Sequence, residues 1–156
     1  MEPMQNPTCS ATTNVKLLRK FSLFNIRGLC PSSVPSKVPY ISDLLYEKDQ
    51  LLMALTETWL KDHKDDELHI EGYQLFRSDR KRAKKSTRGR LSGGVAAYIH
   101  KDLADETTVK LQFSNGTVEV LGLHSALENI YIAVIYRQPN YSVYFYYFTT
   151  FWVIDL

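Results

Sequence analysis

Apolar residues recur along the chain in short runs that polar turns separate. Residues 51–55, LLMAL, form a continuous apolar run, which is typical of a strand buried on both faces. Residues 107–113 instead alternate, with Val109, Leu111 and Phe113 on one face. Ser114-Asn115-Gly116 then predicts a hairpin into a strand at 118–123.

The other segments complete a strand-rich pattern with one clear helix. Apolar residues at helical spacing predict that helix over 38–48, after a loop at 31–39 that holds three prolines. Gly93 and Gly94 open one strand and allow a close approach of its backbone to a neighbour or a ligand. The remaining strands are expected at 20–26, 73–76, 95–99 and 130–136, the last pairing with 118–123. This order favours an α+β fold or a layered sandwich.

Length and composition favour one globular domain. A chain of 156 residues is long enough for one core, and 44% hydrophobic with 23% charged residues excludes wholesale disorder. Residues 1–16 are expected to be a flexible leader, without the pattern of a signal peptide. Two cysteines, Cys9 and Cys30, without that signal favour free thiols and an intracellular protein.

Positive charge is concentrated in residues 77–90, RSDRKRAKKSTRGR. This segment holds eight of the 19 Lys and Arg residues and one of the 17 acidic residues, a local charge of +7 in a chain of net charge +2. Such a loop suits a polyanion, because phosphate contacts release counterions. A solvated loop or a nuclear-import patch would have the same composition. The candidate nucleic-acid contacts are Arg80, Lys81, Arg82, Lys84, Lys85, Arg88 and Arg90.

Several motifs occur together in one order: FSLFNIRGL from Phe21, ALTETWL from Ala54, GYQLFRSD from Gly72, SGGVAAYIH from Ser92 and IAVIYRQPN from Ile132. Together they resemble the endonuclease/exonuclease/phosphatase superfamily, and most closely the endonuclease domain that precedes the reverse transcriptase in LINE-type (non-LTR) retrotransposons. The resemblance covers 17–140 as the N-terminal part of such a domain. It implies an α/β fold, a sandwich of two sheets with one sheet from each half, so the inner face of the first sheet is expected to be uncovered.

Residues 141–156, YSVYFYYFTTFWVIDL, do not match the family. Eight of these sixteen residues are aromatic, and the segment is shorter than the ~20 apolar residues that span a bilayer. A read-through past a truncation, frameshift or exon boundary is the preferred explanation. An aromatic strand that caps the exposed sheet face is the second, and a tail anchor the third.

The resemblance assigns the candidate site residues. Glu57, at the end of the buried strand, matches the family's metal-binding glutamate, and a carboxylate suits Mg²⁺. Asn25 ends the first strand, where it would meet Glu57 and orient the metal environment. Tyr136 matches the tyrosine beside the scissile phosphate, to which its phenol would donate. Packing or turn formation would also account for each residue.

Two arginines are candidate phosphate contacts, Arg77 with Asp79 as its orienting partner, and Arg137. A surface ion pair explains Arg77 equally well. Asn140 matches a family asparagine only with a shifted spacing. The four histidines, at 63, 69, 100 and 124, are not spaced like metal ligands and are expected at the surface or in strands.

The predicted function is that of a fragment of a Mg²⁺-dependent DNA endonuclease from a retrotransposon polyprotein. The family completes its chemistry with a Gly-Asp-Phe-Asn-like segment and a later Asp-His pair, and neither follows Asn140. The fragment is therefore expected to be inactive alone. The alternative is a nonenzymatic relic that binds nucleic acid weakly through the basic loop. DNA is the expected partner and the nucleus the expected location, with no membrane and no small-molecule cofactor.

Overall fold

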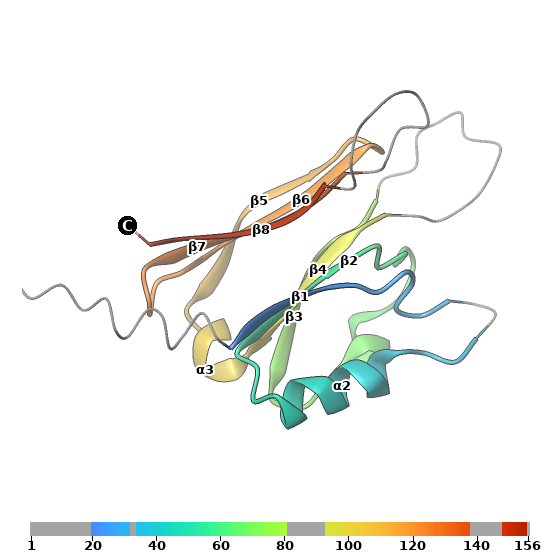
Figure 1. The fold of residues 1–156 in the computed structure, drawn as a ribbon, viewed down its shortest axis with the longest axis horizontal. Coiled ribbons are helices and arrows are strands. Elements are labelled where there is room, and N and C mark those ends of the chain that lie inside the picture. The colour runs from blue at the N-terminus through green and yellow to red at the C-terminus, as the bar shows by residue number, and fades with distance from the viewer. Residues whose placement is uncertain (1–19, 32–33, 81–92, 138–147, 156) are drawn as a thin grey trace, which may run out of the picture.

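The computed structural model describes residues 20–31, 34–80, 93–137 and 148–155, which build two β-sheets and two short helices (Figure 1). The described residues are mostly β. The expectation of an α/β sandwich is therefore confirmed for the two packed sheets only. In chain order the elements are β1 (Phe21–Asn25), α2 (Val38–Glu47), β2 (Leu52–Thr56), the 3₁₀ turn η1 (Asp65–Leu68), β3 (Tyr73–Ser78), β4 (Val95–His100), α3 (Lys101–Ala104), β5 (Thr107–Ser114), β6 (Val118–Ser125), β7 (Ile130–Arg137) and β8 (Phe148–Asp155).

The first sheet has the order β1-β2-β4-β3, with β1 parallel to β2 and the other two pairs antiparallel. All five residues of β2 are buried, as the continuous apolar run predicted. On one face the helix α2 contributes Ile41 and Leu45 to a core with Met53, Leu55 and Tyr98. Both faces of β2 are thus covered, which explains its lack of alternation.

The second sheet is antiparallel, in the order β5-β6-β7-β8. The predicted hairpin between β5 and β6 is confirmed, since the Asn115 side chain accepts hydrogen bonds from the backbone N–H groups of Thr117 and Val118. Gly116 supplies the positive φ, +85°, that this turn requires. The predicted pairing of 118–123 with the strand at 130–136 is also confirmed.

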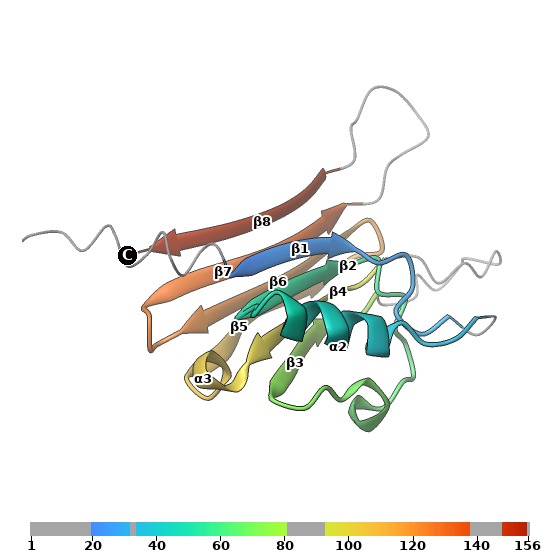
Figure 2. The same cartoon turned by 60° about the horizontal axis from the view of Figure 1, so that its bottom comes forward.

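The two sheets pack face to face, and α2 covers the far side of the first sheet (Figures 1 and 2). Leu121, Leu123, Ile132 and Val134 of the second sheet share one buried core with residues of β2, β3 and β4. The expectation of an uncovered inner face was therefore wrong. The alternating residues of β6 and β7 cover that face themselves.

Of the three explanations for residues 141–156, the structure bears on the second, an aromatic strand that caps a sheet face. Residues 148–155 form β8, which pairs with β7 along the edge of the second sheet instead of lying on a sheet face (Figure 2). Residues 141–147 and 156, like 1–19, lie outside the described residues. No helix of the described part is long and apolar enough to cross a membrane.

Candidate functional site

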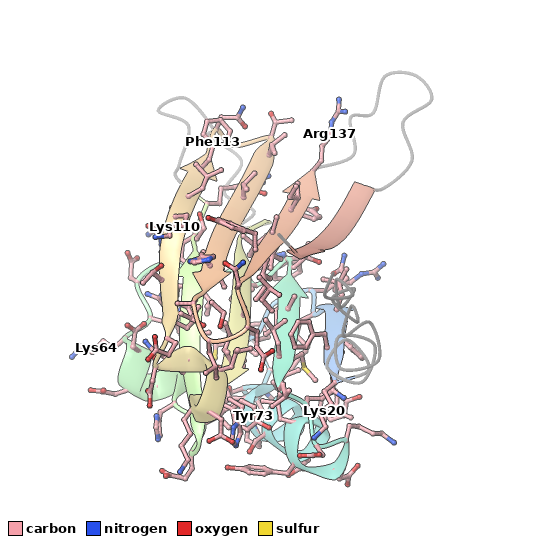
Figure 3. All side chains as sticks on the ribbon, turned by 90° about the vertical axis from the view of Figure 1, so that its left-hand side faces the viewer. Lys20, Lys64, Tyr73, Lys110, Phe113 and Arg137 are labelled. Atoms are coloured by element: carbon pink, nitrogen blue, oxygen red, sulfur yellow. The ribbon has the colours of Figure 1, made fainter. Side chains whose placement is uncertain are left out.

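The strand ends that carry the predicted site meet at one end of the sandwich. Asn25, the last residue of β1, is the register partner of Thr56 at the end of β2, and Thr56 in turn faces Val95 at the start of β4. The last two residues of β7, Tyr136 and Arg137, belong to this end as well. Figure 3 shows Phe113 and Arg137 at one end and Lys20 and Tyr73 at the other. We call the first the site end and the second the distal end.

Glu57 is the centre of a three-residue cluster. The Asn25 side-chain amide donates to Glu57 Oε1 over 3.2 Å, and the Tyr136 hydroxyl donates to the same oxygen over 2.9 Å. These partners are 32 and 79 positions away in sequence and come from both sheets. The structure therefore brings together the three residues that the motifs had singled out.

The turn that carries Glu57 has an unusual backbone. Glu57 and Trp59 have φ angles of +54° and +55°, in the left-handed region that non-glycine residues rarely adopt. Such residues cost of order 1–3 kcal/mol each and occur where surrounding structure enforces them.

Neighbouring backbone enforces this turn from two sides. On one side the N–H groups of Gly28 and Leu29 donate to the carbonyls of Glu57 and Thr58. On the other side Thr58 N and Trp59 N donate to the carbonyls of Gly94 and Gly93. The side chain of Glu57 is thus held by a fixed turn and not by a mobile loop tip.

The two glycines before β4 allow this close approach, as predicted. Their φ angles are +98° and +86°, and a Cβ on Gly94 would lie 2.6 Å from Thr58 Oγ1. A Cβ on Gly93 would lie 2.6 Å from Arg80 Nε. Both positions therefore need glycine for conformation and for space.

The phenol of Tyr136 is held in its protonated form. Only 3% of the residue is exposed, and burial is the main cause that raises the pKa of Tyr136 above its ordinary value. The hydrogen bond to Glu57 and the negative charges of Glu57 and Glu119 raise this pKa further, while Arg80 lowers it. At neutral pH the side chain is a hydrogen-bond donor.

The Glu57 carboxylate is the type of ligand that a hard divalent cation takes. Both hydrogen bonds that the described residues make to this carboxylate fall on Oε1, and the side chain is partly exposed. Magnesium commonly takes one or two protein carboxylates and completes its shell with water and substrate oxygens. Within the described ranges no group of three or more His, Cys, Asp or Glu residues could hold a metal ion.

Arg77 is not part of this cluster. Its side chain donates to the carbonyl of His63 over 2.8 Å and pairs with Asp65 and Asp79, each over 3.4 Å. The expected Asp79 partner is confirmed, and burial raises the pKa of Asp79 while the Arg77 charge opposes that shift. Strand alternation places Arg77 with Leu75 on the face of β3 that looks away from the second sheet. Arg77 thus ties β3 to the loop at 63–65.

Of the other predicted phosphate and nucleic-acid contacts, Arg137 lies among the described residues and most of the rest do not. Arg137 is exposed and follows the inward-facing Tyr136, so alternation directs it to the opposite face of β7. Asn140 lies outside the described residues, and so do Lys81, Arg82, Lys84, Lys85, Arg88 and Arg90 of the basic segment.

Arg80 and Glu119 form a pair that the sequence reasoning missed. Arg80 Nε donates to Glu119 Oε1 over 2.7 Å, and the side chains are 16% and 0% exposed. Arg80, which was predicted to contact nucleic acid, instead lies mostly buried between the sheets, where it pairs with Glu119. The signal was available in sequence, because Glu119 stands in the inward phase of a strand whose other inward residues are Leu121, Leu123 and Ser125.

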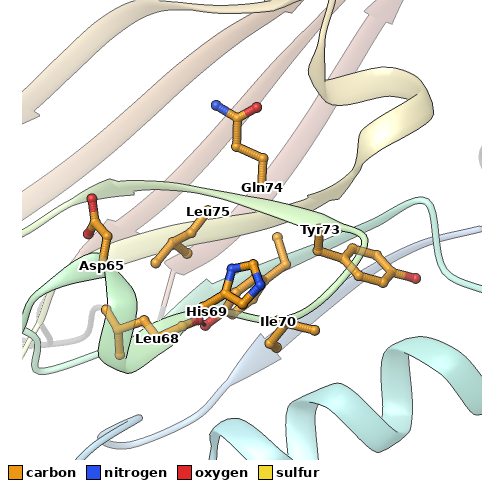
Figure 4. A pocket seen from close by; sticks show the side chains of 8 residues that line it. Asp65, Leu68, His69, Ile70, Tyr73, Gln74 and Leu75 are labelled. Carbon is orange, nitrogen blue, oxygen red and sulfur yellow. Dashed lines mark hydrogen bonds between the residues drawn. The ribbon is translucent and has the colours of Figure 1, made fainter.

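A separate cavity of about 290 Å³ lies between η1 and β3, lined by Leu68, Ile70, Tyr73 and Tyr98 among others (Figure 4). The Tyr98 hydroxyl is already engaged, donating to the Leu68 carbonyl over 2.7 Å. None of the three residues of the Glu57 cluster lines this cavity.

The chain matches no protein-family model and no curated protein.

Proposed function

We propose that this chain carries part of the phosphodiester-binding site of a Mg²⁺-dependent DNA endonuclease resembling those of LINE-type retrotransposons. The observation that supports it most is the convergence of Asn25, Glu57 and Tyr136 on one carboxylate oxygen. Residues chosen from motif context alone lie on β1, in the turn after β2 and on β7, and both Asn25 and Tyr136 are within hydrogen-bond distance of Glu57. Packing alone gives no reason for a carboxylate, an amide and a phenol to meet at a strained turn.

Each residue has a chemical task in this proposal. Glu57 would hold Mg²⁺, and Asn25 would orient the Glu57 carboxylate through its amide. The bound cation would stabilise negative charge on a phosphate. Tyr136, kept protonated by burial, would donate its hydroxyl proton to a non-bridging phosphate oxygen.

We expect binding without cleavage by this chain. Among the described residues, those that contact Glu57 are an amide and a phenol, and neither takes a proton from water at neutral pH. Incubation with supercoiled plasmid and Mg²⁺ should therefore give no nicking above a Glu57→Ala control. Nicking that depends on Mg²⁺ and on Glu57 would show that the chain is a complete enzyme.

Cation binding tests the proposal directly. Titration with Mg²⁺ should shift the NMR signal of the Asn25 side-chain amide in a saturable way, because Mg²⁺ on Glu57 changes the acceptor of that amide. Glu57→Gln should abolish the shift. Glu47→Gln, at an exposed carboxylate at the end of α2, is the matched control and should leave it unchanged. No shift in the unchanged protein would contradict the proposal.

Nucleic-acid binding without catalysis is the second candidate, and the anchoring of the basic segment favours it. Arg80 and Gly93, which flank the segment 81–92, lie against each other and beside the Glu57 turn. Residues 81–92, which hold six of the eight Lys and Arg residues of the basic segment, are therefore attached at both ends to the site end.

The salt dependence of DNA affinity tests this second candidate. Affinity should be independent of sequence, with log K falling by about 0.9 per tenfold rise in salt for each phosphate neutralised. Neutralising Lys81, Arg82, Lys84 and Lys85 should flatten that slope. An unchanged slope would mean that these side chains contact only solvent.

A further inference from the structure

The Arg80–Glu119 pair links the two sheets at the site end. Arg80 follows β3 of the first sheet, and Glu119 lies on β6 of the second. Glu119 is also the register partner of Tyr136 on β7, and both side chains face inward. Directly opposed residues of antiparallel strands have Cβ atoms about 4.5–5.5 Å apart. The pair therefore stands next to the tyrosine of the Glu57 cluster.

Stability alone does not account for this pair. Burial of two charges carries a desolvation cost, and replacing such a pair with apolar residues is often neutral or stabilising. Here one carboxylate oxygen, Glu119 Oε2, is buried without a hydrogen-bond partner among the described residues. Residue 93 also has to be glycine, because a Cβ there would lie 2.6 Å from Arg80 Nε. These costs collect at one place, beside Tyr136.

We propose that Glu119 is a positioning residue, which through Arg80 holds the two sheets at a fixed separation and so keeps the Tyr136 hydroxyl on Glu57. Two inter-sheet links then act together at the site end: Arg80 to Glu119, and Tyr136 to Glu57. The first is an ion pair with most of its surface buried. The second is a single hydrogen bond, which holds the Tyr136 hydroxyl at Glu57 until a substrate phosphate replaces the carboxylate as its acceptor. The role of Tyr136 toward a phosphate rests on the proposed function. The effect of the Arg80–Glu119 pair on the hydrogen bond from Tyr136 to Glu57 does not.

A fluorinated tyrosine incorporated at position 136 reports the contact. At neutral pH, where this phenol is protonated, its ¹⁹F chemical shift responds to the acceptor of the hydroxyl, and ¹⁹F NMR follows this residue alone among ten tyrosines. The described groups that act on this phenol are Glu57 after β2, Arg80 after β3 and Glu119 on β6. Glu57→Gln removes the acceptor charge and should change the ¹⁹F chemical shift at position 136.

The decisive measurement is a double-mutant cycle between Glu57 and the pair. The variant R80M/E119Q removes one positive and one negative charge, so it breaks the link and keeps the local net charge. If the pair positions Tyr136, Glu57→Gln should shift the ¹⁹F signal less than half as far in R80M/E119Q as in the unchanged pair. An equal shift in both backgrounds would overturn the proposal.

Two controls keep the cycle interpretable. Asp49→Asn, at the exposed distal pair with Lys20, should leave the Glu57→Gln shift unchanged. If R80M/E119Q does not melt cooperatively, E119Q alone serves as the background, and an equal shift there again overturns the proposal. The cycle uses neither metal nor DNA, so a failed Mg²⁺ titration contradicts the proposed function and leaves this result standing.

Discussion

Each end of the sandwich has an ion pair and a turn with positive φ, but the two ion pairs differ in burial. At the distal end Lys20 pairs with Asp49 in an exposed contact, and Tyr73 donates to the carbonyl of Gln50. At the site end the ion pair between Arg80 and Glu119 is buried. Turns at both ends include non-glycine residues with positive φ, Asp49 at one and Glu57 with Trp59 at the other.

The two ends differ in how deeply their ion pairs are buried. The charge of Asp49 faces solvent, which screens it, whereas the charges of the site end are held between two sheets. Polar groups in a low-dielectric interior interact strongly and are costly when they lose a partner. The site end is therefore organised at the expense of stability, as expected of a place that binds a ligand. Substitutions at matched positions of the two ends can test this contrast.

Removing one member of the buried pair should have the largest effect. Arg80→Met leaves Glu119 buried without its cation, so we expect a loss of about 3–5 kcal/mol in the free energy of unfolding. Urea denaturation followed by circular dichroism measures this loss. R80M/E119Q should recover most of it. A loss below that of ordinary surface substitutions would mean that the site end is no more demanding than the distal end.

Glycine replacement should separate the ends next. Gly94 and Gly72 both have positive φ, but a Cβ on Gly72 meets only Tyr46 Oη at 3.8 Å, against 2.6 Å to Thr58 Oγ1 for Gly94. Gly72→Ala should therefore cost only the backbone strain, about 1–2 kcal/mol. Gly94→Ala should cost about 1–3 kcal/mol more, because the turn has to move. Equal losses in thermal and urea denaturation would show that the Glu57 turn yields easily.

Local sequence patterns predicted most of the strands, because a strand depends on short-range information, whereas the Glu57 cluster was predicted from the family resemblance. The apolar run at 51–55 identified a strand covered on both sides, and the ends of parallel neighbours such as β1 and β2 meet at one sheet edge. Asn25 and Glu57 were expected to meet across adjacent strand ends, and the family resemblance singled them out. Tyr136 required motif context, since ten tyrosines dilute the signal of any one.

The features that were missed depend on long-range pairing. Arg80 belongs to a charge run that looks solvated, and its partner is 39 residues away on the other sheet. The covering second sheet was missed because the family resemblance assigned it to residues after 140. The inward positions of β6 and β7 nonetheless carry Leu121, Leu123, Ile132 and Val134, which already specify a buried face.

A substitution that relieves the backbone strain at Glu57 should have a smaller effect, a gain in stability instead of a loss. Glu57→Gly and Glu57→Ala both remove the carboxylate, but only glycine adopts a φ of +54° without steric cost. We expect Glu57→Gly to be more stable than Glu57→Ala by about 1–2 kcal/mol, with both variants lacking the Mg²⁺ response of Asn25. Differential scanning calorimetry compares the two. Equal stabilities would indicate that the backbone at this turn relaxes once its side chain is removed.

The smallest effect is expected at the distal end, from Asp49→Asn. Asparagine tolerates the left-handed conformation, φ +47° at this position, so the substitution removes the charge and keeps the turn. Lys20 lowers the pKa of Asp49 by hydrogen bonding and by its charge, so the ionised carboxylate stabilises the fold. This contribution is present above the ordinary aspartate pKa of about 4 and is lost as the pH falls through the lowered value. Because the pair is exposed, thermal melts of the two proteins should nearly coincide at neutral pH and converge fully in acid. A large gap at neutral pH that closes in acid would show that the distal pair is as important as the buried one, and would remove the contrast between the two ends.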